Sequence, residues 1–179
     1  MEVCVLLLRD MIESDIEDYV RWFTKETEWE NWDSPWESVE SSEEEERKYW
    51  KEYYDTVKDL PADVTRRKYE IELDGVHIGW ICYYKNLGYA ENKENIPVIG
   101  LDIPCKENRK NGCGTLAFRM YMDYLKEHGY NSFYTQTWSG NLAMVRVAEK
   151  LGFKEVYRKA NHREVNGKLY DAITWRLDI

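Results

Sequence analysis

The segment Asn108–Phe118, NRKNGCGTLAF, places a glycine-bearing basic loop between two apolar stretches of different period. Upstream, PVIGLDI (97–103) is rich in β-branched residues and predicts a strand. Downstream, apolar residues at helical spacing predict a helix with one buried face, formed by Cys113, Leu116, Ala117, Met120, Tyr121 and Tyr124. The first N–H groups of such a helix have no partners within it, and the positive end of the helix macrodipole lies there too. This arrangement favours a bound phosphate or pyrophosphate.

The side chains of the loop support an anion site without requiring one. Gly112 and Gly114 leave room for an anion to approach the main chain, and Arg109 and Lys110 add positive charge at the rim. The glycines could equally serve only to shape a tight turn from strand to helix. The spacing is not that of a P-loop, and a dinucleotide-binding fold places such a loop in its first strand–helix unit. The loop alone therefore leaves an anion site and a plain turn open.

The remaining pattern predicts strands and helices within one sheet-based fold. Asx-Gly pairs at 74–75 and 166–167, each between β-rich runs, indicate two hairpins. A helical pattern over 142–152 ends at a glycine, and Ser41 or Ser42 can cap an earlier helix. The expected order is strand, two helices, three strands, helix, strand, helix and two strands. Such an order favours a mixed α/β fold with one layer of sheet and helices on its faces.

Composition argues against several classes of function. The chain of 179 residues carries a net charge of −9, whereas duplex nucleic acid requires a basic surface. Four cysteines and three histidines show no ligand spacing, so no metal site is predicted. The apolar run at residues 3–8 lacks the flanks of a signal peptide, and no run is long enough to span a bilayer. We expect a cytoplasmic protein that binds neither nucleic acid nor membrane.

Two motifs together resemble one enzyme family. RKNGCG at 109–114 is similar to the R/Q-x-x-G-x-G/A signature of the GNAT superfamily of acetyl-CoA-dependent N-acetyltransferases. NLAMVRVAEKLGF at 141–153 resembles that family's second motif, an Asn-led helix ending in a Lys-Leu-Gly-Phe turn. The tail at 162–177 is similar to the branch of ribosomal-protein-alanine (RimJ/RimL-type) enzymes. The resemblance implies an α/β (α+β) fold in a single GNAT domain over residues 1–179, with a mixed, mostly antiparallel sheet of six to seven strands and about four flanking helices.

The resemblance also implies a site for acetyl-CoA as cosubstrate. Backbone amides from Lys110 to Thr115 would hold its pyrophosphate, and the main chain at 103–105 would pair with its pantetheine arm. Asn141 would hydrogen-bond the same arm, although an asparagine at that position can also serve only as a helix cap. The residues expected to contact acetyl-CoA are Ile103, Pro104, Cys105, Arg109, Lys110, Asn111, Gly112, Cys113, Gly114, Thr115 and Asn141.

Acyl transfer from a thioester to an amine needs a base and an acid for the leaving thiolate. Asp102, beside the expected cofactor strand end, is the candidate base, either directly or through water; a solvated or helix-capping carboxylate is the alternative. Glu70 and Glu72 are reserve candidates that we expect to be exposed. Many family members carry a tyrosine as the acid four residues before the Gly-Phe turn, where this chain has Ala148. The acid stays unassigned, and its candidates are solvent, Tyr134 and Tyr170.

The first helices and the closing hairpin would flank the acceptor in this fold. They are rich in aromatic and acidic residues, which indicates either a pocket for a cationic amine or an aromatic core beneath a solvated acidic face. The residues expected to contact the acceptor are Trp32, Trp36, Tyr134 and Trp138. We expect an amine on a small molecule, such as a polyamine or aminoglycoside, or at a peptide N-terminus. A non-catalytic acetyl-CoA sensor and a homodimer also stay open.

Overall fold

The computed structural model describes residues 5–37, 40–88, 92, 94–109 and 111–179. Its strands are β1 (Leu6–Arg9), β2 (Lys68–Leu73), β3 (Val76–Tyr84), β4 (Val98–Asp102), β5 (Ser132–Trp138), β6 (Lys154–Val165) and β7 (Lys168–Asp178). Its helices are α1 (Asp15–Thr24), α2 (Glu30–Asp33), α3 (Glu43–Val57), α4 (Cys113–Glu127) and α5 (Leu142–Lys150). The short 3₁₀ turns η1 (Thr27–Trp29) and η2 (Lys106–Asn108) precede α2 and α4. The predicted order of strands and helices is confirmed, with α2 as a short addition.

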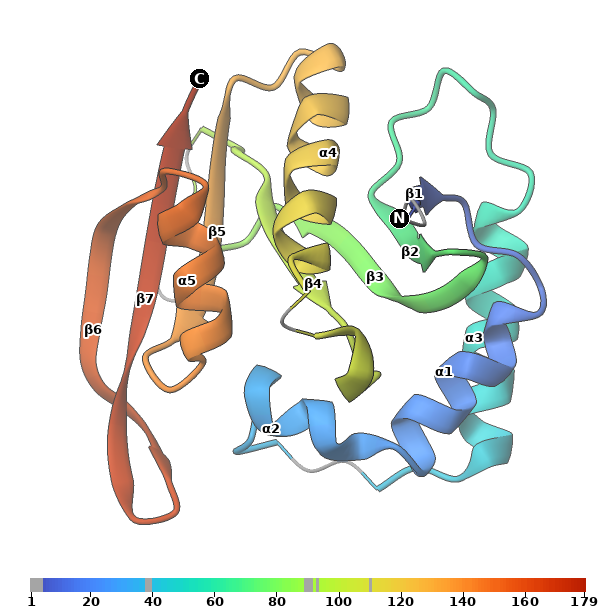
Figure 1. Cartoon of the computed structure of the whole chain (residues 1–179), viewed down its shortest axis with the longest axis horizontal. Helices are drawn as coiled ribbons and strands as arrows, with labels where there is room; N and C mark the ends of the chain where they lie inside the picture. The colour runs from blue at the N-terminus through green and yellow to red at the C-terminus, as the bar shows by residue number, and fades with distance from the viewer. Residues whose placement is uncertain (1–4, 38–39, 89–91, 93, 110) are drawn as a thin grey trace.

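The seven strands of the described chain form one sheet in the order β1-β2-β3-β4-β5-β7-β6 (Figure 1). Neighbouring strands are antiparallel except β4 and β5, which are parallel. The predicted mixed, mostly antiparallel sheet is therefore confirmed. Its one parallel pair lies at the centre and joins two antiparallel halves, β1–β4 and β5–β7.

Both predicted hairpins form, and each turns through two residues with positive φ. Asp74 and Gly75 have φ of 51° and 80°, and Asn166 and Gly167 have φ of 51° and 75°. Two successive residues with positive φ are the mark of a type I′ turn, whose twist matches that of antiparallel strands. These turns set the register of β2 with β3 and of β6 with β7, and so decide which side chains face which layer.

Helices cover both faces of the sheet (Figure 1). On the face of α4 and α5, the core combines aliphatic and aromatic side chains, and its fully buried members include Ile71, Ile81, Ile99, Phe118 and Phe133. On the face of α1 and α3, the core is aromatic and includes Tyr19, Trp22, Trp29, Trp50 and Trp80. No helix within the described ranges is both long enough and apolar enough to cross a membrane.

Register aligns two rows of side chains on the face of α1 and α3. Residues directly opposite each other in antiparallel strands point to the same face. Both rows cross β2, β3 and β4. The Lys68 row consists of Lys68, Cys82 and Gly100. The Asp102 row consists of Glu70, Trp80 and Asp102. The Asp102 row lies at the carboxyl end of β4.

Candidate active site

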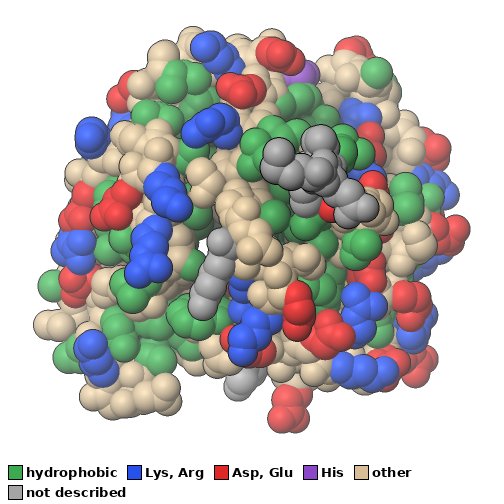
Figure 2. Space-filling view, in the orientation of Figure 1, with side chains coloured by type: hydrophobic (Ala, Val, Ile, Leu, Met, Phe, Trp, Pro, Cys, Tyr) green, Lys and Arg blue, Asp and Glu red, His purple; other side chains and the backbone are tan. Residues whose placement is uncertain are grey.

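The two parallel strands separate toward their carboxyl ends. Among the described residues, register joins β4 to β5 at the single pair Val98 and Tyr134. The hydroxyl of Thr135 donates to the carbonyl of Ile99 at 2.8 Å, and beyond these residues the described pairing of β4 is with β3 and that of β5 with β7. Figure 2 shows the surface hollowed between the start of α4 and α5. The edges that face this gap can pair with an extended amide-bearing ligand, since exposed strand edges pair with extended backbones.

The start of α4 opens at the same end of the sheet. Gly112 is the N-cap, with φ of 83°, and no side chain caps the helix within the described residues. The first helical hydrogen bond runs from the N–H of Leu116 to the carbonyl of Gly112 at 3.0 Å. A Cβ at Gly112 would meet nothing within 4 Å, whereas one at Gly114 would touch Leu101 at 3.5 Å. The start of α4 therefore packs on β4 at Gly114 and leaves open space at Gly112. Lys110, which was also expected in this site, lies outside the described residues.

Arg109 is held within the protein by three hydrogen bonds. Its guanidinium donates to the carbonyls of Ile103, at 2.7 Å, and Pro104, and to a carboxylate oxygen of Glu28 at 2.7 Å. It therefore fastens the loop to the end of β4 and to the segment before α2. The sequence offered no signal for the Glu28 contact, because the two residues are 81 positions apart. Asn111, beside it, donates from its side chain to the carbonyl of Glu107 at 3.3 Å.

Asn141 caps α5 and also holds α2. Its side-chain oxygen accepts from the N–H of Met144 at 3.0 Å, which is the capping role considered above. Its side-chain nitrogen donates to the carbonyl of Trp32 at 2.8 Å, and the indole N–H of Trp138 donates to the same carbonyl at 2.8 Å. The carbonyl of Trp32 thus anchors α2 to the end of β5 and the start of α5.

The structure brings three of the four expected acceptor residues together. Trp36 meets Trp138 edge-on, with ring centroids 6.0 Å apart, and Trp138 meets Tyr170 edge-on at 4.8 Å. Trp32 joins them through its carbonyl, while 44% of the residue is exposed. Tyr134 lies four residues before Trp138 on β5, and its hydroxyl accepts from Arg176 at 3.2 Å.

Asp102 ends β4 at the mouth of the gap. Burial and the nearby carboxylate of Asp33 raise the pKa of Asp102 well above its usual range, while Lys68 and Arg109 oppose this rise. Burial also raises the pKa of Asp33. A Cβ at Gly79 would overlap the carbonyl oxygen of Asp102, so this part of β3 needs a glycine. The geometry places a carboxyl group with increased proton affinity beside the cleft.

Ala148, which stands where many family members carry an acid tyrosine, is buried in the core of the α4 and α5 layer. It has no hydroxyl to present to the gap. Cys105, three residues beyond the end of β4, has its pKa raised by burial, which disfavours the thiolate.

The expectation that Glu70 is exposed is wrong. Glu70 is 1% exposed and accepts hydrogen bonds from the hydroxyl of Tyr19 at 2.6 Å and from a ring nitrogen of His77 at 3.1 Å. Glu72 is half-buried and accepts from Arg9 at 2.6 Å. Alternation along β2 alone could not reveal that an aromatic layer covers Glu70.

A lysine of the chain itself occupies the aromatic cluster beneath α1 and α3. The ammonium of Lys68 lies 4.1 Å from the ring centroid of Tyr19, 4.4 Å from that of Trp50, 5.0 Å from that of Tyr53 and 5.5 Å from that of Trp80. We call these four rings the aromatic box. Because a cation already fills it, the box is not free to bind the ammonium of an acceptor, and the aromatic pocket hypothesis does not apply to Trp50 and Tyr53.

A second buried charge cluster lies behind the aromatic box. Asp15, Asp18 and His77 place potential ligand atoms within 4.8 Å of one another. Arg9 donates to both carboxylate oxygens of Asp15 at 2.7 and 2.8 Å, so the cluster already contains a cation.

Comparison with known proteins identifies the family. The family model described as Acetyltransferase (GNAT) domain matches residues 5–154. Similar solved structures include a ribosomal-protein-alanine N-acetyltransferase from Brucella melitensis, with 16% identity, 97% of this chain and 99% of that chain covered, and a TM-score of 0.70. RimL, a ribosomal L7/L12 alpha-N-protein acetyltransferase solved with coenzyme A, has 18% identity, coverage of 97% and 94%, and a TM-score of 0.73. The structure of yncA from Salmonella typhimurium, solved with acetyl-CoA, has 13% identity, covers 97% of this chain and 93% of its own, and has a TM-score of 0.68.

No curated protein matches the chain in sequence. At identities this low, the likeness to solved structures establishes the fold. The family model, in contrast, spans most of the 179 residues and both motifs up to the end of the Gly-Phe turn. The chain therefore belongs to the GNAT family of acetyltransferases.

Proposed function

We propose that this chain transfers the acetyl group of acetyl-CoA to a primary amine by direct attack within a ternary complex. The observation that carries the proposal is the meeting of two open features at one end of the sheet. The uncapped start of α4 at Gly112 fits a pyrophosphate, and the gap between β4 and β5 fits an extended, amide-bearing arm. When bound, acetyl-CoA supplies an acetyl group activated as a thioester.

Different residues around the gap would contact different parts of acetyl-CoA. The N–H groups from Gly112 to Thr115 would contact the pyrophosphate, and the main chain from Ile103 to Cys105 would pair with the pantetheine arm. Asn141 would keep its cap to Met144 and turn its side-chain N–H groups from α2 to the same arm. Arg109 would hold the loop in shape through its carbonyl contacts.

Asp102 is the proposed base. Most amines are protonated near neutral pH, so the acceptor must lose a proton before its lone pair can attack. Burial and Asp33 raise the pKa of Asp102, which makes this carboxyl group a better proton acceptor than an exposed aspartate. Backbone N–H groups near Ile103 would contact the developing oxyanion. The proton for the departing thiolate is assigned to no side chain, because position 148 is an alanine.

A peptide N-terminus is the acceptor that we favour. The acceptor would enter beside the aromatic group of Trp36, Trp138 and Tyr170, between α2 and the β6–β7 hairpin. The names of the Brucella and RimL neighbours refer to acetylation of ribosomal proteins, which supports a peptide and a place in the RimJ/RimL-type branch. A polyamine or amino sugar is the alternative, and Asp33 and Asp102 would favour it for its positive charge.

A non-catalytic acetyl-CoA sensor is the second candidate function. It is favoured by Ala148, which removes the tyrosine that commonly serves as the acid. A sensor would bind acetyl-CoA and release no thiol with any amine.

The test is a thiol-release assay with acetyl-CoA against N-terminal peptides, polyamines and amino sugars. The wild type is compared with Gly112→Trp, which fills the opening at the start of α4. Gly75→Trp is the matched control, because Gly75 also has positive φ and open space but lies at the remote β2–β3 turn. Release with one amine class that is lost in Gly112→Trp and kept in Gly75→Trp supports the proposal. Binding without release supports the sensor, and no binding of acetyl-CoA refutes both.

A further inference from the structure

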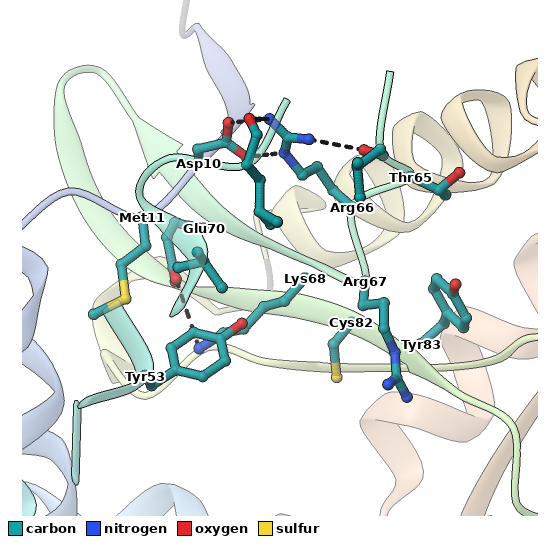
Figure 3. Close-up of a pocket in the computed structure, with 13 residues that line it drawn as sticks. Asp10, Met11, Tyr53, Thr65, Arg66, Arg67, Lys68, Glu70, Cys82 and Tyr83 are labelled. Atoms are coloured by element: carbon teal, nitrogen blue, oxygen red, sulfur yellow. Dashed lines mark hydrogen bonds and ion pairs between the residues drawn. The ribbon is translucent and has the colours of Figure 1, made fainter. Parts of the chain in front are cut away.

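Lys68 is a largely buried cation that contacts four aromatic rings and a carboxylate. Its side chain is 12% exposed, and its ammonium lies 3.6 Å from a carboxylate oxygen of Glu70 in addition to the four rings of the aromatic box. Figure 3 shows the side chain running toward Tyr53, with its contact to Glu70 drawn. Lys68, Glu70 and Cys82 are among the residues that line a cavity of about 420 Å³ between the strands and the end of α3. Cation–π contacts and the carboxylate together hold the charge at a defined point on this face of the sheet.

The same charge lies close to the proposed base. Lys68 and Asp102 project from the same face, two strands apart, in adjacent rows. Trp80 belongs to both arrangements: it is opposite Asp102 in register, and its ring is one wall of the aromatic box. Strand spacing and rise place the two Cα atoms about 12 Å apart. The lysine leans toward Glu70 and Trp80, which lie in the Asp102 row, so the two charges are about 10 Å apart.

We propose that Lys68 is a positioning residue of the acetyl-transfer reaction, whose caged ammonium favours the ionised form of Asp102. The inference rests on the proposed role of Asp102 as base. Lys68 touches neither substrate in this proposal and acts on the reaction only through the field at Asp102. The aromatic box matters because a free lysine side chain in water would be screened and mobile, whereas this one is fixed and largely desolvated.

The other charges that face Asp102 act in known directions. Asp33 of α2 raises the pKa of Asp102, and Arg109 of the loop before α4 lowers it, as Lys68 of β2 does. The thiol of Cys82 on β3 stays neutral, because burial raises its pKa to about 11.

Lys68 is itself subject to opposing effects from its surroundings. Burial lowers the pKa of Lys68, and Glu70, on its own strand, opposes this most strongly. Cys82 of β3 and Asp15 of α1 act in the same direction as Glu70. Tyr19 and Tyr53 face Lys68 from α1 and α3, and the pKa of each hydroxyl is raised by burial, so both are neutral.

The size of the effect follows from Coulomb's law. Two unit charges about 10 Å apart in an effective dielectric of about 20 shift each other's titration midpoint by about one pH unit. A neutral side chain at position 68 should therefore raise the midpoint of Asp102 by about one unit. An arginine, which retains the charge and also packs on aromatic rings, should leave it nearly unchanged.

The experiment follows the carboxyl carbon of Asp102 by NMR in protein labelled with ¹³C-aspartate, and therefore needs no acceptor. The signal is assigned by its loss in Asp102→Asn. Wild type, Lys68→Met and Lys68→Arg are titrated under the same ionic strength. We expect a midpoint about one unit higher in Lys68→Met and unchanged in Lys68→Arg; an unchanged midpoint in folded Lys68→Met overturns the proposal.

A reciprocal measurement protects the test if Lys68→Met does not fold. Coupling between two sites is symmetric, so neutralising Asp102 must lower the midpoint of Lys68 by the same amount. The lysine is followed by ¹³C at its ε carbon in wild type and in Asp102→Asn, with a drop of about one unit expected and no change refuting the coupling. Failure of the thiol-release assay leaves both titrations readable, so loss of the proposed function and loss of this inference are separate outcomes.

Discussion

His77 should make the stability of the fold fall as the pH rises above neutral. Oxygen atoms lie beside both nitrogens of its ring: Asp18 at 3.0 Å from Nδ1, and Glu70 and the carbonyl of Gly79 each at 3.1 Å from Nε2. Only the protonated ring donates on both sides. Burial disfavours this charge, but the hydrogen bonds to Asp18 and Glu70 outweigh it and raise the pKa of His77 to about 9.

The magnitude follows from the difference between the folded and unfolded pKa values. The unfolded value is 6.5 and the folded value is about 9, a difference of about 2.5 units, which corresponds to about 3 kcal/mol. The side chain of His77 is 3% exposed, so solvent screening does not reduce this figure much. Because the folded pKa is the higher one, this stabilisation is complete below about pH 6.5. The stabilisation is lost as the pH rises from about 6.5 to about 9, because in this range the folded state binds more protons than the unfolded state.

Urea unfolding at about pH 6 and about pH 9.5 measures this loss. We expect the free energy of unfolding of the wild type to fall by about 3 kcal/mol between the two conditions, a large part of the total for a domain of this size. The His77→Gln variant controls for every other group that titrates in this range. If the wild type and His77→Gln lose stability in parallel, His77 is not charged in the folded protein and the reasoning is refuted.

Four further substitutions test the geometry of the site. Gly79→Ala should lower the melting temperature by several degrees, because its Cβ would overlap the carbonyl of Asp102 and force β3 from β4; an unchanged melting curve would contradict the close approach. Trp32→Ala should raise the KM of the amine and leave the affinity for acetyl-CoA unchanged, and equal kinetics would remove Trp32 from the acceptor site. Trp138→Phe removes the indole N–H that holds α2, and we expect a KM for the amine several-fold higher with little change in melting temperature. Gly112→Ala should lower the free energy of unfolding by about 1 kcal/mol, because the φ of Gly112 is 83°. Urea unfolding measures this loss, and Gly75→Ala, at another glycine with positive φ, is the matched control for backbone strain.

Elements with a local signal were predictable from the sequence. The Asx-Gly turns define two hairpins because both residues must adopt positive φ. The glycine of the loop sits at the N-cap of α4, and Asn141 caps α5, as the preference of asparagine for that position suggests. Each of these features depends on residues within a few positions of one another, where spacing carries the information.

Contacts between distant segments were not predictable from the sequence. Arg109 reaches Glu28 across 81 positions, and Trp138 reaches the carbonyl of Trp32 across 106. No periodicity encodes such pairs, because they arise only when the helices are docked on the sheet. Glu70 was misjudged for the same reason: strand alternation shows which face it is on but not whether a helix covers that face.

The short pairing between β4 and β5 in the described part of the chain has a consequence for how the molecule folds. Each half of the sheet is built from antiparallel strands, most of them neighbours in sequence. Among the described residues, register joins the two halves at one pair, Val98 and Tyr134, and the side chain of Thr135 adds a hydrogen bond to Ile99; these strands are separated in sequence by the whole of α4. Local pairings form before distant ones, since closing a long loop costs entropy that later contacts must offset. We expect the β5–β7 half to dock late in folding and to be the first part to separate under force. A ligand that pairs with the edges of both β4 and β5 would link the two halves. Its binding would stabilise the fold in proportion to the logarithm of the ligand concentration.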